Sequence, residues 1–261
     1  VQALPITCRV LFECAVDFLT ELCGCTVVLC TATQPVTDLD NKPEEITGDV
    51  ERLFSSMKRV NIHDETQKML SAERLSGLIG KYGSLLMIVN TKPMARKLYE
   101  LMKDRVTSVH LSTGMYPEHR LRLIDLIKSR DKSKPFFCVS TSLIEAGINI
   151  SFPCVVRSLA GLGSILQAAG RCNRNGESER GEVFVWQLDE NLRNLPEIKA
   201  AAEITRGLLV DEENIGSLEN INIYFERERD KLPEMISKFS DKRIGDFKKL
   251  VKATPHNHNK A

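Results

Sequence analysis

The chain has 261 residues, and its 42% hydrophobic content is enough to bury a full core in one large domain, or in one domain with attachments. Thirty-six basic residues against thirty-five acidic ones leave a formal net charge of +1, which excludes a uniformly basic surface and confines any nucleic-acid footprint to a local groove. No apolar run could span a bilayer and no CxxC pair suggests zinc, so we expect a soluble cytoplasmic protein with free thiols and no metal site.

The first part of the chain predicts one helix and one strand. Residues 12–24 have helical periodicity, residues 26–34 (TVVLCTATQ) read as a strand, and the polar stretch 35–48 resembles a linker. One helix and one strand cannot form a domain, so we interpret residues 1–34 as the tail of a missing domain or as an element that packs elsewhere. Because the first residue is Val, we expect the numbering to begin inside a longer gene product.

From residue 84 onward, apolar runs alternate with helical patterns. Residues 84–90 (SLLMIVN) are a continuous apolar run, typical of a strand that is buried on both faces. Residues 91–104 follow as a helix, in which Thr91 can cap the first turn and Pro93 suits it. The apolar stripe of this helix is predicted to be Met94, Leu98, Leu101 and Met102. The later strands are predicted at 106–112, 134–142, 153–160 and 181–189, and the later helices at 116–130 and 163–174.

This alternation predicts an α/β fold with a parallel sheet that is covered by helices on both faces. The predicted domain spans residues 49–190, and residues 191–261 form a helical C-terminal extension, with helices expected over 195–214 and within 225–251. Ligands of such sheets bind at the carboxyl ends of the strands, where this chain has the small polar segments VNT, HLSTG and VSTS.

The segment QAAGRCNR, residues 167–174, carries two arginines in a stretch that could not fill a core. On a helix, Gln167, Arg171 and Arg174 share one face, and Gly170 allows close approach of a ligand or another backbone. Guanidinium groups suit phosphate oxygens because their planar donors match bidentate geometry. Two arginines alone would be more typical of a solvated basic face, so the surrounding segments must decide.

The segment VSTSLIEAGINI, residues 139–150, places three hydroxyls at the end of a strand, before Gly147. Hydroxyls and free amides there could hold a phosphate of a nucleic-acid strand, with Glu145 and Asn149 pointing from the same loop. Taken alone, such a cluster more often reflects simple turn chemistry.

Five segments together resemble motifs III to VI of superfamily 2 helicases, with a closer similarity to the CRISPR-associated helicase-nuclease of type I interference systems. The segments are TATQP at 31–35, VNT at 89–91, HLSTGM at 110–115, VSTSLIEAGINI at 139–150 and QAAGRCNRNGE at 167–177. The likeness covers roughly residues 1–190, and VQALP at 1–5 is similar to the stretch directly after the family's Walker B motif. It therefore implies a second RecA-like lobe whose first lobe, phosphate loop and nuclease domain are missing.

The resemblance also implies roles for individual residues. Arg171 and Arg174 both match the motif that supplies catalytic arginines, with Arg174 expected to be the arginine finger. Gln167 would be catalytic with them by orienting the attacking water or the arginine. The expected cofactor-side residues are Gly147, Asn149 and Gly170. The expected nucleic-acid and coupling residues are Thr31, Thr33, Asn90, Thr91, Ser112, Thr141 and Glu145. The family more often has Asp at the position of Asn149 and Gln at that of Ser142, which puts a ribose or magnesium contact there in doubt.

The function implied is that of an ATP-dependent single-stranded-DNA helicase in CRISPR interference. Its cofactors, ATP and Mg²⁺, would both need the missing first lobe, so this chain alone is expected to be inactive. The implied partners are single-stranded DNA, the missing lobe and nuclease domain, and the CRISPR surveillance complex, with no membrane. Two alternatives stay open: a superfamily 2 helicase of RNA metabolism or DNA repair, and a non-catalytic binding module on this fold.

Overall fold

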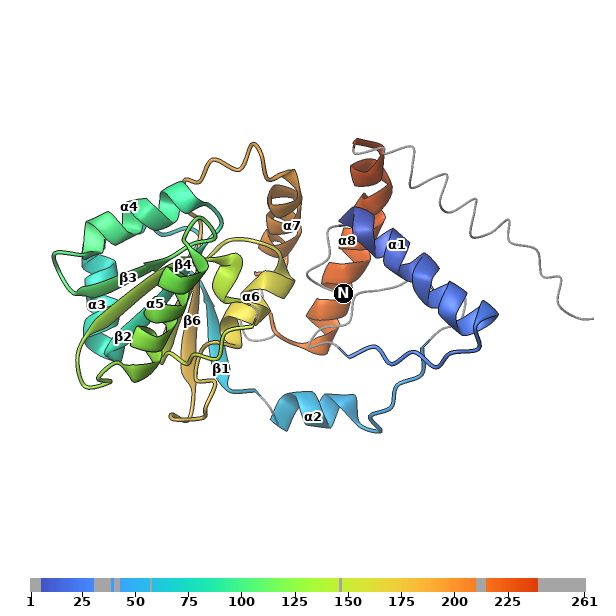
Figure 1. Ribbon diagram of the computed structural model, residues 1–261, viewed down its shortest axis with the longest axis horizontal. Helices are drawn as coiled ribbons and strands as arrows, with labels where there is room; N and C mark the ends of the chain where they lie inside the picture. Colours follow the sequence, from blue (N-terminus) through green and yellow to red (C-terminus); the bar gives the residue numbers. More distant parts are fainter. Residues whose placement is uncertain are drawn as a thin grey trace, which may run out of the picture. The chain divides into compact units, whose positions relative to one another are not determined.

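The computed structural model describes residues 6–30, 39, 43–56, 58–145, 147–209 and 215–238. The chain divides into two compact units, of which one spans Glu51–Tyr224 and the other comprises the segments before and after it. The larger unit holds every strand found in the described ranges (Figure 1). The C-terminal boundary of this unit is Tyr224, whereas the sequence led us to end the predicted domain at residue 190.

The larger unit is built on a six-stranded parallel sheet. The strands are β1 (Val60–Asp64), β2 (Ser84–Val89), β3 (Thr107–Leu111), β4 (Phe136–Thr141), β5 (Cys154–Ser158) and β6 (Gly181–Trp186). Their order across the sheet is β1-β6-β5-β2-β4-β3, and every neighbouring pair is parallel. The central strands β2, β4 and β5 are buried along their whole length, and for β2 the continuous apolar sequence predicts this.

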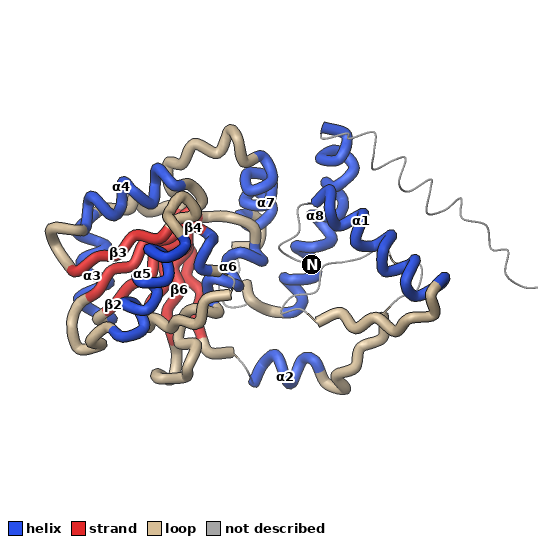
Figure 2. The backbone as a smooth tube through the Cα atoms, in the orientation of Figure 1, coloured by secondary structure: helices blue, strands red, loops and turns tan. Residues whose placement is uncertain are grey.

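Helices cover both faces of the sheet (Figure 2). On one face, α3 (Ala72–Tyr82) and α4 (Lys92–Met102) pack into a core cluster with Leu85 and Met87 of β2. On the other face, α5 (Pro117–Ser129) and α6 (Leu162–Ala169) pack into a second cluster with Leu86 and Ile88 of the same strand. Alternate residues of β2 thus serve opposite cores. The predicted RecA-like α/β class, with helices on both faces, is confirmed.

Helix α4 begins as the sequence predicts. The Thr91 hydroxyl accepts a hydrogen bond from the main-chain N–H of Met94, and Pro93 lies in the first turn, where a missing N–H costs nothing. Leu98 and Met102 are buried in the predicted apolar stripe, and Ala95 joins them. Leu101, which we also expected in that stripe, is 42% exposed.

The first part of the chain differs from the prediction. Helix α1 (Ile6–Asp17) continues as a π-helix (Phe18–Leu22), but residues 26–30 form no strand. The prediction of a strand is wrong there because no described strand lies beside this segment to complete its hydrogen bonds. Residues 31–34, the rest of that prediction, lie outside the described residues.

Three elements were not predicted, namely α2 (Val50–Ser56), β1 and α3. Toward the other end of the chain, α7 (Pro196–Arg206) is shorter than expected because Gly207 caps it, and α8 (Leu218–Lys238) begins before the predicted start at residue 225. No helix in the described ranges combines the length and the apolar character needed to cross a membrane.

Candidate functional site

The carboxyl end of β2 is held by a carboxylate from beyond β6. Both main-chain N–H groups of Asn90 and Thr91 donate to Glu190 Oε1, at 3.0 and 2.8 Å, and the Thr91 hydroxyl donates to the same oxygen at 3.0 Å. The Asn90 side-chain amide donates to Glu190 Oε2 and to the Leu159 carbonyl, both at 3.0 Å. Asn90 and Thr91 are therefore fixed in place, and Glu190 fixes them.

Sequence reasoning missed Glu190. The residue follows the last strand in the sequence, and only the strand order β6-β5-β2 brings it beside Asn90, a hundred positions earlier. The one available signal was a carboxylate shortly after a parallel strand. The carboxyl ends of parallel strands meet at one edge of the sheet, so such a residue can lie beside the residues that follow the other strands. The Ser158 hydroxyl at the end of β5 also donates to Glu190, which completes the cluster.

Ser112 and Thr141 end the next two strands along this edge. Ser112 is buried, and a side-chain methyl placed on Gly114 would lie 3.9 Å from Ser112 Oγ and 3.8 Å from Lys92 Nζ. A hydroxyl and an ammonium group thus flank the space that Gly114 leaves. The Thr141 hydroxyl is buried without a hydrogen-bond partner in the described part of the chain. An unsatisfied buried hydroxyl is unfavourable, which makes Thr141 the more notable of the two.

Glu145 does not point into solvent from its loop. Its carboxylate lies 3.0 Å from Nε of Arg157 on β5, and the two side chains are 6% and 2% exposed. Burial raises the pKa of Glu145, and the neighbouring charge of Arg157 opposes that rise. Arg157 also donates to Asn90 Oδ1 at 2.8 Å, so this ion pair adjoins the Glu190 cluster.

Arg171 and Arg174 do not lie on a helix, contrary to the prediction of a helix over 163–174. Helix α6 ends at Ala169 because Gly170 and the next two residues turn back onto the last carbonyls, and Asn173 then adopts a positive φ of 45°. The shared face that we expected for Gln167, Arg171 and Arg174 therefore does not exist. Gln167 remains on α6, half-buried.

The two arginines have different surroundings. Arg171 is 7% exposed, and its guanidinium donates to the main-chain carbonyls of Ile144, at 2.9 Å, and Glu145. Burial lowers the pKa of Arg171, and the nearby charge of Arg174 adds to this, yet an arginine remains charged at any working pH. The Arg171 guanidinium thus anchors the loop that follows β4.

Arg174 is exposed, and its guanidinium is held at the surface by two acceptors. Its Nε donates to Asn149 Oδ1 at 3.0 Å, and Nη1 donates to the Gly170 carbonyl at 3.2 Å. Its main-chain N–H donates to the Ser151 hydroxyl at 3.1 Å. Three residues that the sequence analysis selected separately, Asn149, Gly170 and Arg174, are therefore in direct contact.

The backbone of this region turns sharply just before Asn149, where Gly147 has a φ of 73°. Among the described residues, the acceptors of the Arg174 guanidinium are one side-chain amide oxygen and one main-chain carbonyl. Such a set leaves guanidinium donors for phosphate oxygens.

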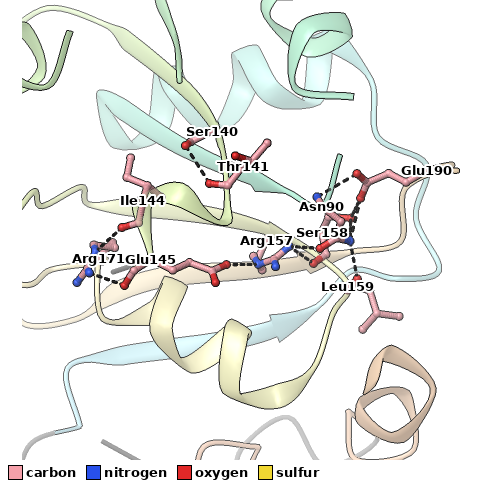
Figure 3. A network of polar contacts seen from close by, with 10 residues as sticks. All are labelled: Asn90, Ser140, Thr141, Ile144, Glu145, Arg157, Ser158, Leu159, Arg171 and Glu190. Atoms are coloured by element: carbon pink, nitrogen blue, oxygen red, sulfur yellow. Dashed lines mark hydrogen bonds and ion pairs between the residues drawn. The ribbon is translucent and has the colours of Figure 1, made fainter. Parts of the chain in front are cut away.

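The selected residues form two groups at different places on the lobe. Asn90, Thr91 and Ser112 follow the carboxyl ends of their strands. The Arg171–Arg174 segment instead pairs with Phe152, just before β5, and packs against Gly181, the first residue of β6. Figure 3 shows Glu145 and Arg157 in the space between the groups. Thr31 and Thr33 lie outside the described residues.

Comparison with known proteins finds similarity to CRISPR-associated nuclease/helicase proteins. A family model for the C-terminal region of the CRISPR-associated nuclease/helicase Cas3 matches residues 81–177. The CRISPR-associated nuclease/helicase Cas3 of Haloferax volcanii is 44% identical over 81 residues, which are 30% of this chain and 9% of that protein. The chain thus spans about a tenth of this curated relative.

Two crystal structures of T. fusca Cas3 share the fold. The structure of Cas3-AMPPNP has a TM-score of 0.53 at 15% identity, covering 69% of this chain and 26% of that chain. The structure of Cas3-ATP has a TM-score of 0.52 at 16% identity, covering 75% and 27%. The matched motif segments 89–91, 110–115, 139–150 and 167–177 all lie within residues 81–177. Residues 81–177 therefore resemble the C-terminal region of the CRISPR-associated nuclease/helicase Cas3, and the lobe around them shares the fold of the T. fusca Cas3 structures.

Proposed function

We propose that this chain provides the second RecA-like lobe of an ATP-dependent single-stranded-DNA helicase that unwinds target DNA in CRISPR interference. The observation that carries the proposal is the exposed guanidinium of Arg174. Asn149 and Gly170 accept hydrogen bonds from two of its nitrogens, and these two bonds do not use all of its N–H donors. An arginine that is fixed at the surface is suited to meet phosphate charge presented by a second lobe. The match of residues 81–177 to the family model for the C-terminal region of Cas3 supports the same function.

On the nucleotide side, Arg174 acts as the arginine finger in this proposal. ATP would provide the phosphoryl group, and Mg²⁺ would neutralise its charge. Both would be held chiefly by a first lobe that carries the phosphate loop. Arg171 does not reach the nucleotide but holds the loop through the carbonyls of Ile144 and Glu145. Gln167 orients the attacking water or Arg174. The names of the T. fusca structures, Cas3-ATP and Cas3-AMPPNP, support a nucleotide site in this family.

On the strand side, the hydroxyls of Ser112 and Thr141 contact phosphates of single-stranded DNA. Thr141 has a hydroxyl without a partner among the described residues, and Ser112 faces the same space as the Lys92 ammonium. A cation and hydroxyls at one edge suit a phosphate backbone, because such contacts need charge and hydrogen bonds but no sequence information. Asn90 and Thr91 position this edge, since Glu190 already engages them.

The remaining partners belong to the same proposal. The upstream lobe supplies the phosphate loop and the magnesium, and Thr31 and Thr33 couple hydrolysis to strand movement. The histidine-aspartate nuclease domain and the CRISPR surveillance complex act with the assembled protein. Opening and closing of the cleft in each ATP cycle changes the grip on DNA and moves the protein along it.

The test is single-stranded-DNA-stimulated ATPase activity of this chain after it is combined with its upstream lobe. The chain alone should show no turnover. The combination should hydrolyse ATP, and Arg174→Ala should reduce kcat about a thousandfold, as loss of an arginine finger does in related phosphoryl-transfer enzymes. Gly114→Ala should weaken DNA binding, because its methyl occupies the space between Lys92 and Ser112 at ordinary contact distance.

Each component of the proposal can fail separately. ATP turnover by the chain alone would contradict a site divided between two lobes. Full activity of Arg174→Ala would contradict the assignment of Arg174 as the arginine finger. Stronger stimulation by RNA than by DNA would favour a helicase of RNA metabolism. Absence of ATPase activity, when this chain and its upstream lobe are both folded and bound to each other, would favour a non-catalytic binding module.

A further inference from the structure

Arg157 is a buried cation to which none of the helicase motifs assigns a role. Its side chain is 2% exposed, and its Nε lies 3.0 Å from Glu145 Oε1. Its Nη1 donates to Asn90 Oδ1 and to the Ser158 carbonyl, both at 2.8 Å. One guanidinium therefore contacts two loops, of which one follows β2 and the other follows β4.

Stability alone is a weak reason for this arrangement. Removing two charges from water is costly, and well-packed apolar side chains in place of a buried ion pair are often as stable or more so. Arg157 lies on the face of β5 that carries Val155, within an otherwise apolar core. What apolar side chains could not supply is a charged link between Asn90 and Glu145. It is a hydrogen bond on the Asn90 side and, on the Glu145 side, an ion pair whose two facing atoms do not meet hydrogen-bond geometry.

That link completes a continuous line of polar contacts across the lobe (Figure 3). Glu190 holds Asn90, Asn90 accepts from Arg157, and Arg157 pairs with Glu145. The carbonyl of Glu145 in turn accepts from Arg171. One end of the line is the loop at the proposed strand-contacting edge, and the other is the segment that carries the proposed arginine finger.

We propose that Arg157 is a positioning residue that couples the strand-contacting edge to the arginine segment. A displacement of the loop at Asn90 when DNA binds is passed through the rigid guanidinium to Glu145, and from its carbonyl to Arg171. The inference rests on the proposed function, and it adds the internal route by which DNA stimulates ATP hydrolysis. Coupling of this kind is a free energy shared between two sites, so the ratio of activities with and without DNA measures it.

The experiment compares ATPase rates with and without a single-stranded oligonucleotide, using this chain combined with its upstream lobe. Arg157→Lys keeps the charge but replaces a planar fork by one ammonium, which cannot bridge Asn90 and Glu145 in the same way. The stimulation ratio should fall about tenfold. A merely structural residue would lower both rates together and leave the ratio unchanged.

Two further variants protect the test against misfolding. Arg157→Met combined with Glu145→Gln removes both charges, so no orphaned ion remains to destabilise the core, and stimulation should still be lost. Val156→Ala, the neighbouring residue on the opposite face of β5, is the control. It creates a cavity of its own without touching the polar line, and its ratio should match the wild type.

A wild-type stimulation ratio in folded Arg157→Lys and in the folded double variant would overturn the coupling role while leaving the helicase function intact. Absence of stimulation in the wild-type combination is a different failure. It would overturn the proposed function itself, and the coupling role with it.

Discussion

Arg171 and Arg174 are separated by two residues and differ in what their side chains do. Arg171 is buried and donates to two main-chain carbonyls, whereas Arg174 is exposed at the surface. Arg171→Ala should lower the free energy of unfolding by about 2 kcal/mol, because it leaves those buried carbonyls without a charged donor. Arg174→Ala should change it by no more than about 0.5 kcal/mol.

Urea unfolding, followed through the single tryptophan, Trp186, measures both variants under the same conditions. Trp186 is buried in the core, so its fluorescence should report loss of packing. Equal losses of stability for the two variants would contradict the assignment of Arg171 as the anchor and Arg174 as the free donor.

The residue types of this site could be predicted from sequence, but their division of roles could not. The neighbouring segments, rather than the two arginines alone, indicate phosphate chemistry. Gly170 is a local signal that α6 stops at Ala169, but we interpreted it as a point of close approach. The helix stops there through hydrogen bonds of the residues after Gly170. Glu190 and Arg157 escaped notice for a different reason, because their partners are distant in sequence and meet only through the strand order.

At the scale of elements, the start of β6 is packed directly against the arginine segment. A methyl group added at Gly181 would lie 2.5 Å from Cys172 Sγ and 2.8 Å from Asn173 Cβ. Gly181→Ala should therefore lower the free energy of unfolding by about 1–3 kcal/mol through overpacking. It should also reduce ATPase activity in the combined protein, because Asn173 immediately precedes Arg174.

Gly80→Ala on α3 is the matched control. Its methyl would meet nothing within 4 Å, and alanine favours a helix over glycine by up to about 1 kcal/mol, so this variant should be more stable than the wild type. Thermal and urea unfolding of the two variants should shift in opposite directions. A shift in the same direction would show that close packing at Gly181 is not what matters.

Strand β3 introduces a pH dependence through His110. Burial lowers the pKa of His110 from its ordinary value of 6.5, the charge of Arg96 lowers it further, and its Nε2 has no hydrogen-bond partner among the described residues. The folded protein thus disfavours the charged imidazole that the unfolded chain accepts. The stability contributed by neutral His110 is present above pH 6.5 and is lost as pH falls below it.

His110→Phe should remove this dependence, because phenylalanine keeps an aromatic ring near that of Tyr99 but cannot be protonated. Urea unfolding at about pH 7.5 and about pH 5.5, on either side of the ordinary histidine pKa, should show a smaller loss of stability for the variant than for the wild type. The other titrating groups are common to both proteins and largely cancel. Identical losses would mean that His110 is solvated well enough to titrate freely.

The sequence allowed the buried strands to be predicted but not the edge strand β1. Strand β2 is a continuous apolar run, and β4 and β5 begin with apolar residues, because both faces of these strands are covered. Strand β1 carries Asn61 and His63, which contact Glu182 on β6, so its sequence reads as polar. Conversely, residues 26–30 have a strand-like composition without a partner strand in the described part of the chain, which shows that pairing rather than composition decides.

At the scale of the whole molecule, the parallel sheet separates two kinds of site. Its carboxyl edge collects Asn90, Thr91 and Ser112, while the connection after α6 brings Arg174 to the region where β5 and β6 begin. The short segment after β4, Thr141 to Glu145, runs from one toward the other. A rigid sheet therefore suits the proposed function, in which a nucleic-acid strand and a nucleotide are held at separate places.

The extent of the folding unit also belongs to this scale. Compactness places the boundary at Tyr224, beyond the residue 190 that the sequence suggested. Helix α7 lies in the added part, with Ala202, Ile204 and Thr205 buried. A methyl added at Gly161, which precedes α6, would lie 3.0 Å from Ala201 Cβ and 2.6 Å from the Tyr224 hydroxyl, so this stretch packs against the start of α6.

We therefore expect residues 51–224 to fold alone and residues 51–190 to fold poorly. The shorter segment loses the α7 side chains, and each large apolar one contributes about 1.5–3 kcal/mol when buried. Purified segments should show cooperative urea unfolding for 51–224, but a lower midpoint or aggregation for 51–190, where the apolar surface of α6 is uncovered. Equal urea midpoints for the two segments would place the domain boundary near residue 190 and make α7 an attachment to the domain. The segment after α6, which carries Arg171 and Arg174, would then be held in place by the sheet alone.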